Sequence, residues 1–186
     1  MCDFFVCSQF FSEQITSGAH VVHCPGSNLK LASGLCNVAK LQAAGVNVCL
    51  GTDGASSNDD LDMFSEVKLA AFVSKLKANS PVALSAHTLL EMATVNGARA
   101  LGWDDRIGTL EVGMEADIIS VSMKNAPIHD VAANLVYASG SNRVSNVWVA
   151  GRQLLNDGKL VGIDEAKLTE KGSEWAKKIT IDNTKK

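Results

Sequence analysis

Short apolar runs and longer helical patterns alternate along the first part of the chain. Two runs, "HVVHCP" at 20–25 and "VNVCLG" at 46–51, are almost uninterrupted, which is typical of strands covered on both faces. Each run is followed by apolar residues at helical spacing, over 35–44 after the first and over 61–76 after the second. This β–α rhythm predicts a parallel sheet or a barrel.

Other signals in this part predict the elements between and around the two strands. A helix is expected at 8–17. Pro25 is expected to end the first strand, and "GSNLKLASG" (26–34) is expected to form a polar loop bounded by glycines. Ser85 has the position of a helix N-cap, and residues 86–102 after it predict one or two helices.

The pattern changes near Ile107. Residues 107–122 are rich in strand formers, and residues 143–161 alternate apolar and polar side chains about two turns, which predicts antiparallel hairpins. An amphipathic helix with Trp175 on one face is predicted at 164–179. We therefore expect three parts: a βα part at 1–105, an antiparallel sheet at 106–162, and a helix with a polar tail at 163–186.

Composition and charge restrict the class of protein and its partners. Of the 186 residues, 46% are apolar and 20% are charged, as in a globular protein. The net charge of −3 favours neither nucleic acid nor an anionic membrane, and no apolar stretch is long enough to span a bilayer. The amino-terminal residues lack the basic segment of a signal peptide. A small-molecule partner is the remaining expectation.

Cysteine usage indicates the compartment. The chain has five cysteines, an odd number, and no pair of them shows Cys-x-x-Cys spacing. Free thiols in a reducing compartment, most simply the cytosol, are therefore expected. The cysteines concerned are Cys2, Cys7, Cys24, Cys36 and Cys49.

Asp53 is the first candidate for chemistry. It stands in "GTDGASSNDDLDM" just beyond the second strand, and ligands gather at the carboxyl ends of strands in α/β sheets and barrels. The alternative is that Asp53 only caps a turn, since Asp and Gly are common turn residues. Both interpretations remain open from the pattern alone.

The four histidines give little support for a metal site. His20 and His23 lie three apart on one strand and so point to opposite faces, which lets at most one of them join Asp53. His87 and His129 are expected to be solvated. No His-x-His pair is present.

Two polar stretches near Asp53 have both a functional and a structural interpretation. Asn28, between Ser27 and Lys30 in the predicted loop, could bind a polar substrate, or the loop could simply satisfy its own backbone. The acidic run Asp59, Asp60 and Asp62 is better explained as a cap of the following helix than as a second metal site.

Three longer stretches together resemble the amidohydrolase superfamily, in its cytosine-deaminase-like branch. They are "VVHCPGSNLKLASG", "GVNVCLGTDGASSNDDLDMFSE" and "ATVNGARALGWDDRIGTLEVGMEADI". The resemblance is closest to the S-adenosylhomocysteine/5-methylthioadenosine deaminases and the related chlorohydrolases. It implies an α/β fold: the C-terminal part of a metal-dependent (β/α)₈ barrel at 1–105, then part of a small antiparallel β-sandwich at 106–162 and a C-terminal helix.

The resemblance also implies a site. In this family one divalent metal, zinc or iron, is held by a His-x-His pair, a further histidine and the aspartate of the "GTD" motif. That aspartate corresponds to Asp53, which would be a metal ligand, a proton relay and a substrate contact. The resemblance thus implies hydrolysis of a carbon–nitrogen bond in a purine nucleoside such as 5-methylthioadenosine or S-adenosylhomocysteine, with a chlorohydrolase or a guanine-deaminase-like enzyme as the alternative.

The chain departs from the family pattern because the other metal ligands have no counterpart in it. It resembles the family from about the sixth barrel strand onward, so we expect it to be inactive alone. The 20–25 strand would then have an unpaired edge, which favours association with another copy or with a complementing chain. Three hypotheses follow: part of a longer hydrolase, one half of a split hydrolase, or a non-catalytic binding module.

Overall fold

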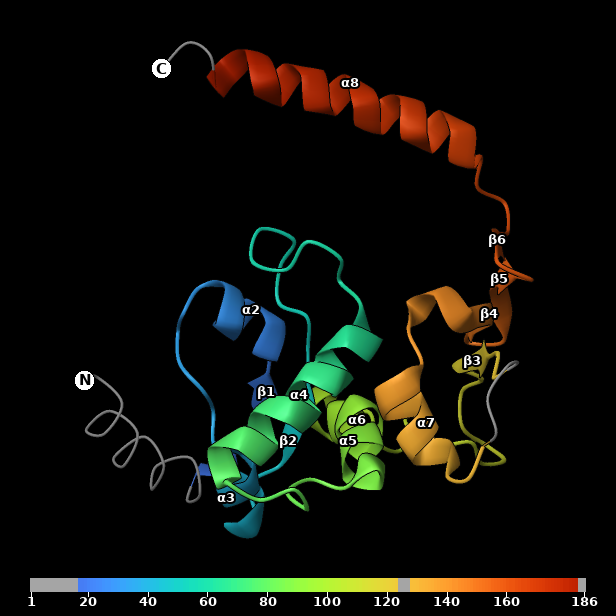
Figure 1. Cartoon of the computed structure of the whole chain (residues 1–186). Helices are drawn as coiled ribbons and strands as arrows, with labels where there is room; N and C mark the ends of the chain where they lie inside the picture. Colours follow the sequence, from blue (N-terminus) through green and yellow to red (C-terminus); the bar gives the residue numbers. More distant parts are fainter. Residues whose placement is uncertain (1–16, 124–127, 184–186) are drawn as a thin grey trace.

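The computed structural model describes residues 17–123 and 128–183, and two short parallel strands lie near the centre of its first part (Figure 1). Strand β1 (Val21–His23) pairs with β2 (Val48–Leu50), with Val21 opposite Val48 and His23 opposite Leu50. This confirms the prediction that the two apolar runs are neighbouring parallel strands. All three residues of β2 are buried, as its continuous apolar sequence predicts.

Helices cover β2 and form the core with it. They are α3 (Val38–Ala43), α4 (Met63–Ala78), α5 (Ala86–Ala93) and α6 (Val95–Leu101). The core consists of buried apolar residues from β2, from α3, α4 and α5 with their connections, and from the later helix α7 (Val131–Ala138): Val38, Leu41, Val46, Val48, Leu50, Val67, Ala70, Ala71, Leu84, Leu89, Met92 and Val136. The predicted helix at 86–102 is in fact two, with Ser85 capping the first and Gly102 ending the second in a left-handed conformation.

The prediction of a loop at 26–34 is wrong, because α2 (Pro25–Lys30) occupies most of it. Pro25 starts this helix and does not merely end the strand. Its fixed φ and missing N–H suit the first helical position. The amide of Asn28 then donates to the carbonyl of Cys24, and the amide of Leu31 to the carbonyl of Ser27.

The second part contains an antiparallel sheet, as predicted. Its strands are β3 (Ile118–Val121), β4 (Val144–Val149), β5 (Arg152–Asn156) and β6 (Lys159–Leu160), paired in that order. A short 3₁₀ turn, η1 (Ser141–Arg143), precedes β4.

Helix α7 (Val131–Ala138) lies between β3 and β4 in the chain and was not predicted. It packs on α4 and α5, where Phe72 stacks on Tyr137 with ring centroids 5.9 Å apart. Asp130 is its N-cap and accepts from the amide of Ala133 at 3.0 Å. Asp130 was therefore the residue from which this helix could have been predicted.

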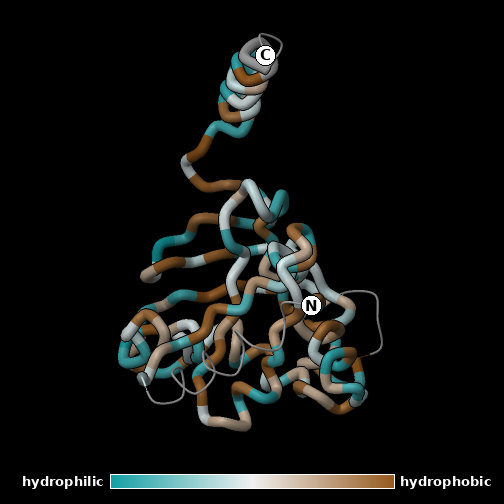
Figure 2. The backbone as a smooth tube through the Cα atoms, turned by 90° about the vertical axis from the view of Figure 1, so that its left-hand side faces the viewer, coloured by the Kyte–Doolittle hydropathy of each residue, from teal (hydrophilic) through white to brown (hydrophobic). Residues whose placement is uncertain are grey.

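Helix α8 (Glu165–Asn183) stands away from the rest of the structure in both views (Figures 1 and 2). The predicted helix is confirmed, but its apolar side chains are more than half exposed: Leu168, Trp175 and Ile179. Within the described residues, none of the helices combines the length and the apolar character that a membrane crossing requires.

Cys24 and Cys49 are free thiols, and Cys36 is partly buried. Cys2, Cys7 and the predicted helix at 8–17, except its last residue, lie outside the described residues.

Candidate functional site

Asp53 lies three residues beyond β2, at the carboxyl end of the parallel pair. Its side chain is exposed, and its backbone is left-handed with φ of +61°. Aspartate adopts this conformation more readily than most residues, but still at a cost. Backbone strain of this kind clusters at functional sites.

Three donors hold the Asp53 carboxylate. The hydroxyls of Ser27 and Ser57 both donate to Oδ2, at 2.7 and 2.9 Å, and the amide of Gly54 donates to Oδ1 at 2.8 Å. The hydrogen bond from Ser27, followed by those from Ser57 and Gly54, lowers the pKa of Asp53 below its ordinary value. The carboxylate is therefore ionised at neutral pH and fixed in direction.

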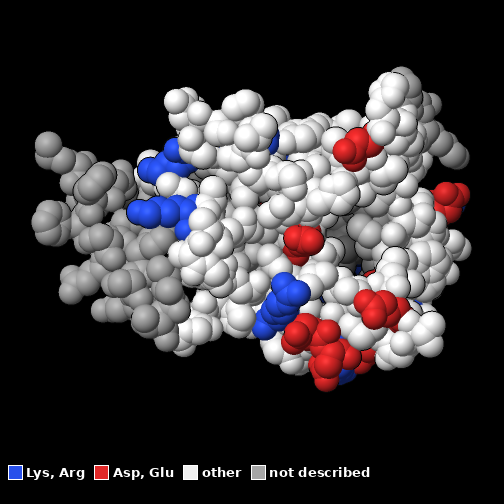
Figure 3. Space-filling model, turned by 90° about the horizontal axis from the view of Figure 1, so that it is seen from below, with Lys and Arg blue, Asp and Glu red and all other residues white. Residues whose placement is uncertain are grey.

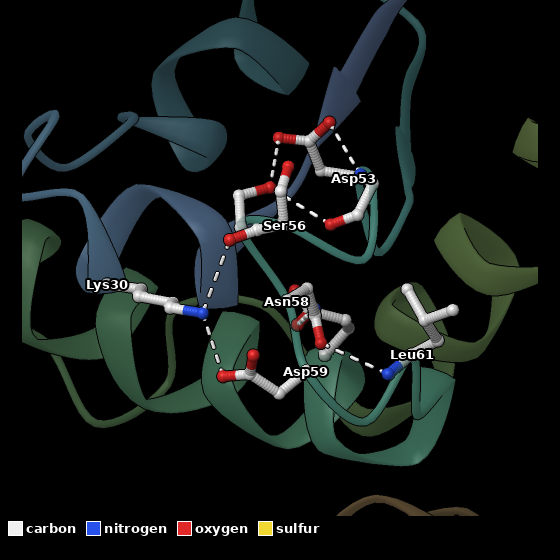
Figure 4. Close-up of polar contacts among 9 residues, drawn as sticks. Lys30, Asp53, Ser56, Asn58, Asp59 and Leu61 are labelled. Atoms are coloured by element: carbon white, nitrogen blue, oxygen red, sulfur yellow. Dashed lines mark hydrogen bonds and ion pairs between the residues drawn. The ribbon is translucent and has the colours of Figure 1, made fainter. Parts of the chain in front are cut away.

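A second carboxylate, Glu66 of α4, lies beneath the same loop and is only 1% exposed. Its Oε2 accepts from the amide of Gly26 at 2.9 Å, and its Oε1 accepts from Nδ2 of Asn58 at 2.8 Å. The Asn58 Oδ1 accepts in turn from the amide of Leu61 at 3.2 Å (Figure 4). Sequence reasoning missed Glu66. The signal was its place four residues before the buried Ala70, on the apolar face of a predicted helix.

The prediction that the acidic run after Asp53 caps the following helix is confirmed for Asp62. Asp62 is the N-cap of α4, and its Oδ1 accepts from the amide of Phe64 at 2.8 Å. Asp59 forms an ion pair with Lys30 at 2.8 Å, and Lys30 also reaches the carbonyl of Ser56 at 3.4 Å (Figure 4).

A shallow, open pocket of about 250 Å³ lies between α2 and the start of α4. Its lining residues are Gly26, Lys30, Ser57, Asn58, Asp59, Asp60, Ser65, Glu66 and Leu69. On the described part of the face in Figure 3, basic side chains form small separate groups, and acidic side chains lie beside one of them.

Asn28 lies on α2, partly buried. The residue of this helix that hydrogen-bonds Asp53 is its neighbour Ser27. Substrate binding by Asn28 stays a prediction.

Of the histidines, only His23 is buried. It is 2% exposed, neither of its ring nitrogens has a hydrogen-bond partner among the described residues, and burial lowers its pKa to about 4. His20 is exposed, as expected for the opposite face of the strand, and its Nδ1 lies 2.8 Å from Nδ2 of Asn47. His87 and His129 are exposed, as predicted.

A model of the amidohydrolase family matches residues 11–154. The chain belongs to the amidohydrolase family.

Several amidohydrolase relatives of this chain are deaminases. It is 48% identical over 166 residues to the 5-methylthioadenosine/S-adenosylhomocysteine deaminase of Teredinibacter turnerae, covering 88% of this chain and 38% of that protein. It is 46% identical over 165 residues to the 5′-deoxyadenosine deaminase of Methanosarcina mazei, covering 87% of this chain and 38% of that protein. The chain thus spans well under half the length of these relatives.

Solved amidohydrolase structures resemble the chain over most of its length. A zinc-bound adenosine deaminase from Xanthomonas campestris has a TM-score of 0.90 at 45% identity, covering 93% of this chain and 40% of that one. A zinc complex of an atrazine chlorohydrolase from Arthrobacter aurescens has a TM-score of 0.82 at 29% identity, covering 89% and 38%. The mixed α/β fold therefore corresponds to a part of the amidohydrolase fold.

Both of these structures hold zinc, and the donor set of this chain shows how far it fits such an ion. A catalytic zinc takes three protein ligands. Among residues 17–123 and 128–183, no group of three His, Cys, Asp or Glu side chains is placed to hold a metal. Asp53 offers one carboxylate, so the described residues by themselves do not fit a zinc ion.

Proposed function

We propose that this chain is the Asp53-bearing part of a metal-dependent hydrolase that deaminates a purine nucleoside such as 5-methylthioadenosine or S-adenosylhomocysteine. The observation that carries the proposal is the Asp53 carboxylate, held by three donors on a left-handed residue at the carboxyl end of β2. The identity to the deaminases of this family supports the choice of reaction.

The proposed architecture is the C-terminal part of a (β/α)₈ barrel. In it, β1 and β2 are adjacent barrel strands, and β3–β6 belong to a small β-sandwich. The parallel register of β1 and β2 supports the first assignment. The half-exposed apolar side chains of the antiparallel sheet support the second, because a sandwich covers one face of each sheet. The proposed parts are 1–105, 106–162 and 163–186.

In the proposed reaction water adds to the carbon that bears the exocyclic amine, and ammonia leaves. Such a reaction needs a group that takes a proton from the attacking water. Asp53 is suited to this role because its carboxylate is ionised at neutral pH and aimed in one direction. We also propose Asp53 as one ligand of a divalent metal, zinc or iron, with the remaining ligands outside the described residues.

Deamination is favoured over dechlorination by the degree of similarity. The chain is 45% identical to the Xanthomonas adenosine deaminase, against 29% to the Arthrobacter chlorohydrolase. An ammonia assay with purine nucleosides is therefore the first test.

The test is a chimera in which the matched segment of the Teredinibacter deaminase is replaced by the matching residues of this chain. With zinc, the chimera should release ammonia from 5-methylthioadenosine or S-adenosylhomocysteine. The Asp53→Asn change should lower its kcat about 10³-fold, within the range of general acid–base catalysis. The 186-residue chain alone should release none.

The controls separate chemistry from folding. Asn tolerates the left-handed conformation, so Asp53→Asn should leave the Tm of the isolated chain nearly unchanged. A folded chimera without activity, or one that keeps full activity with Asp53→Asn, would contradict the proposal. Zinc-dependent ammonia release by the chain alone would show that the site is completed without the relative's residues, as in association between copies.

A further inference from the structure

Two carboxylates bridge the same two segments from opposite sides. One segment is 26–27 in the first turn of α2, and the other is 57–58 in the loop before α4. Asp53 accepts from the serine hydroxyl of each segment. Glu66 accepts from the amide of the glycine in the first and from the asparagine side chain in the second.

The bond from Gly26 to Glu66 is long-range and partly buried, and the bond from Asn58 to Glu66 is buried. Gly26 lies forty positions before Glu66 in the chain, and Asn58 lies eight positions before it. A buried carboxylate is costly unless donors meet it, and here each oxygen has one. A Cβ on Gly26 would collide with Glu66 Oε1, so the contact is also sterically tight.

Backbone hydrogen bonds join the two ends of the loop that follows Asp53. The amides of Ser57 and Asn58 both donate to the carbonyl of Gly54 at 3.0 Å. A shift of Asn58 would therefore move Ser57, and with it a donor to Asp53. Glu66 holds Asn58 from the first turn of α4, a helix whose buried face lies in the core.

We propose that Glu66 is a positioning residue for the amidohydrolase site: it fixes the Ser57–Asn58 pair against α2, so that Ser27 and Ser57 together hold the Asp53 carboxylate in place. Only the expected effect of Glu66 on turnover rests on the proposed function. The mechanical link itself belongs to the 186-residue chain and is measurable there.

The first measurement is hydrogen exchange in the 186-residue chain by NMR. In Glu66→Gln one carboxylate oxygen becomes an NH₂ donor, which must face either the Gly26 amide or the Asn58 amide group. At least one of the Gly26 and Ser57 amides should then exchange about tenfold faster than in the parent chain, as expected for one unmatched buried donor. If both rates stay within about twofold, the proposal is wrong.

The second measurement is rescue. Asn58→Asp combined with Glu66→Gln exchanges donor and acceptor between the two side chains and keeps the total charge. The double variant should restore the exchange rates to within about twofold of the parent. Asn58→Asp alone places two carboxylates next to each other, so its amides should exchange faster than those of Glu66→Gln or of the double variant. A double variant no better than Glu66→Gln overturns the proposal.

A matched control removes general destabilisation as an explanation. Val73→Ala lies on the same helix and is buried, away from these hydrogen bonds. It should lower the Tm without a selective rise at Gly26 and Ser57. If Glu66→Gln does not fold, the double variant decides: restored folding supports the proposal, and continued failure contradicts it.

The chimera separates this inference from the proposed function. In an active chimera, Glu66→Gln should lower kcat about tenfold with little change in KM, and the double variant should recover it. Rescue of exchange in the chain together with an inactive parent chimera would refute the proposed function and keep the mechanical link. An active chimera whose kcat ignores Glu66→Gln would refute the positioning role alone.

Discussion

The region around β2 and the antiparallel sheet β3–β6 differ in how they bury side chains. Every residue of β2 is buried, and the core extends from it into α3, α4, α5 and α7. Within the described strands β3 to β6, no residue is buried, and apolar residues such as Ile119 and Leu154 are 52% and 37% exposed. Both regions have hydrogen-bonded strands, although β3–β4 and β4–β5 each contain a register shift, and the clearest difference between the regions is in side-chain packing.

The difference shows why the candidate site lies where it does. Asp53 sits on a strained residue, and such strain persists only where the surroundings over-determine the conformation. The serines and the buried Glu66 network provide this on the β2 side. Left-handed non-glycine residues also occur in the turns of the antiparallel sheet, at Ala150 and Asp157, but no described residue of strands β3 to β6 is buried around them.

A leucine-to-alanine change in each region should give the largest difference in unfolding free energy. Leu89→Ala opens a cavity in the core, where the side chain is fully buried, and should cost about 2–5 kcal/mol of unfolding free energy. Leu154→Ala in β5 should cost under about 1 kcal/mol, because its side chain already meets water. Urea unfolding followed by circular dichroism measures both. Equal costs would mean that the sheet is covered in solution.

The buried His23, in the region around β2, should make the stability of the chain depend on pH. The folded pKa of His23 is about 4 against an ordinary 6.5, so between these values the unfolded chain takes up a proton that the folded chain refuses. Stability is therefore present above pH 6.5 and falls as the pH drops to 4, by about 3 kcal/mol.

Replacement of the ring tests this directly. His23→Leu should flatten the stability profile between pH 4 and 6.5. Denaturant midpoints over this pH range provide the measurement. A steep profile that survives His23→Leu would assign the dependence to other groups.

Local patterns predicted the strands and helix caps correctly because their causes lie close together in the chain. The two apolar runs and the cap at Ser85 are examples. Helix α2 was missed because Pro25 can either end a strand or begin a helix, and the pattern alone favoured the first. Helix α7 was missed although Asp130 marks its start.

The candidate site was predicted only in part, for a different reason. Asp53 was identifiable from its place after a strand. Its serine donors could not be assigned, because Ser27 and Asp53 are 26 positions apart and only the packing of α2 against the loop joins them. Glu66 was missed although it is a charged residue on the apolar face of a predicted helix, and its role required knowing where Gly26 lies.

Helix caps in the two regions should show a smaller contrast. Ser85 accepts from the amide of Thr88 at 3.1 Å and caps α5 in the core, so Ser85→Ala should lower the unfolding free energy by about 1 kcal/mol. Asp164 accepts from the amide of Lys167 at 3.1 Å at the start of the exposed α8. Asp164→Ala should reduce helicity locally without moving the main transition. A shift of the main transition by Asp164→Ala would show that α8 unfolds together with the core.

Surface ion pairs should show the smallest difference between the two regions. Here the larger stabilisation is expected beside the antiparallel sheet and not beside β2. Lys30 and Asp59 form an ion pair beside the candidate site, and their side chains are 40% and 81% exposed. Arg106 and Glu115, before β3, are 50% and 33% exposed, and Arg106 also lies 5.0 Å from the Trp103 ring centroid. Exposed pairs contribute about 0–1 kcal/mol, and the planar guanidinium holds its partner in a better-defined geometry than a lysine does. Double-mutant cycles with alanine should therefore give a larger coupling for Arg106–Glu115 than for Lys30–Asp59, and high salt should reduce both. A larger coupling at Lys30–Asp59 would mean that the pair helps to hold α2 against the Asp53 loop, and that the support of the site extends to its surface.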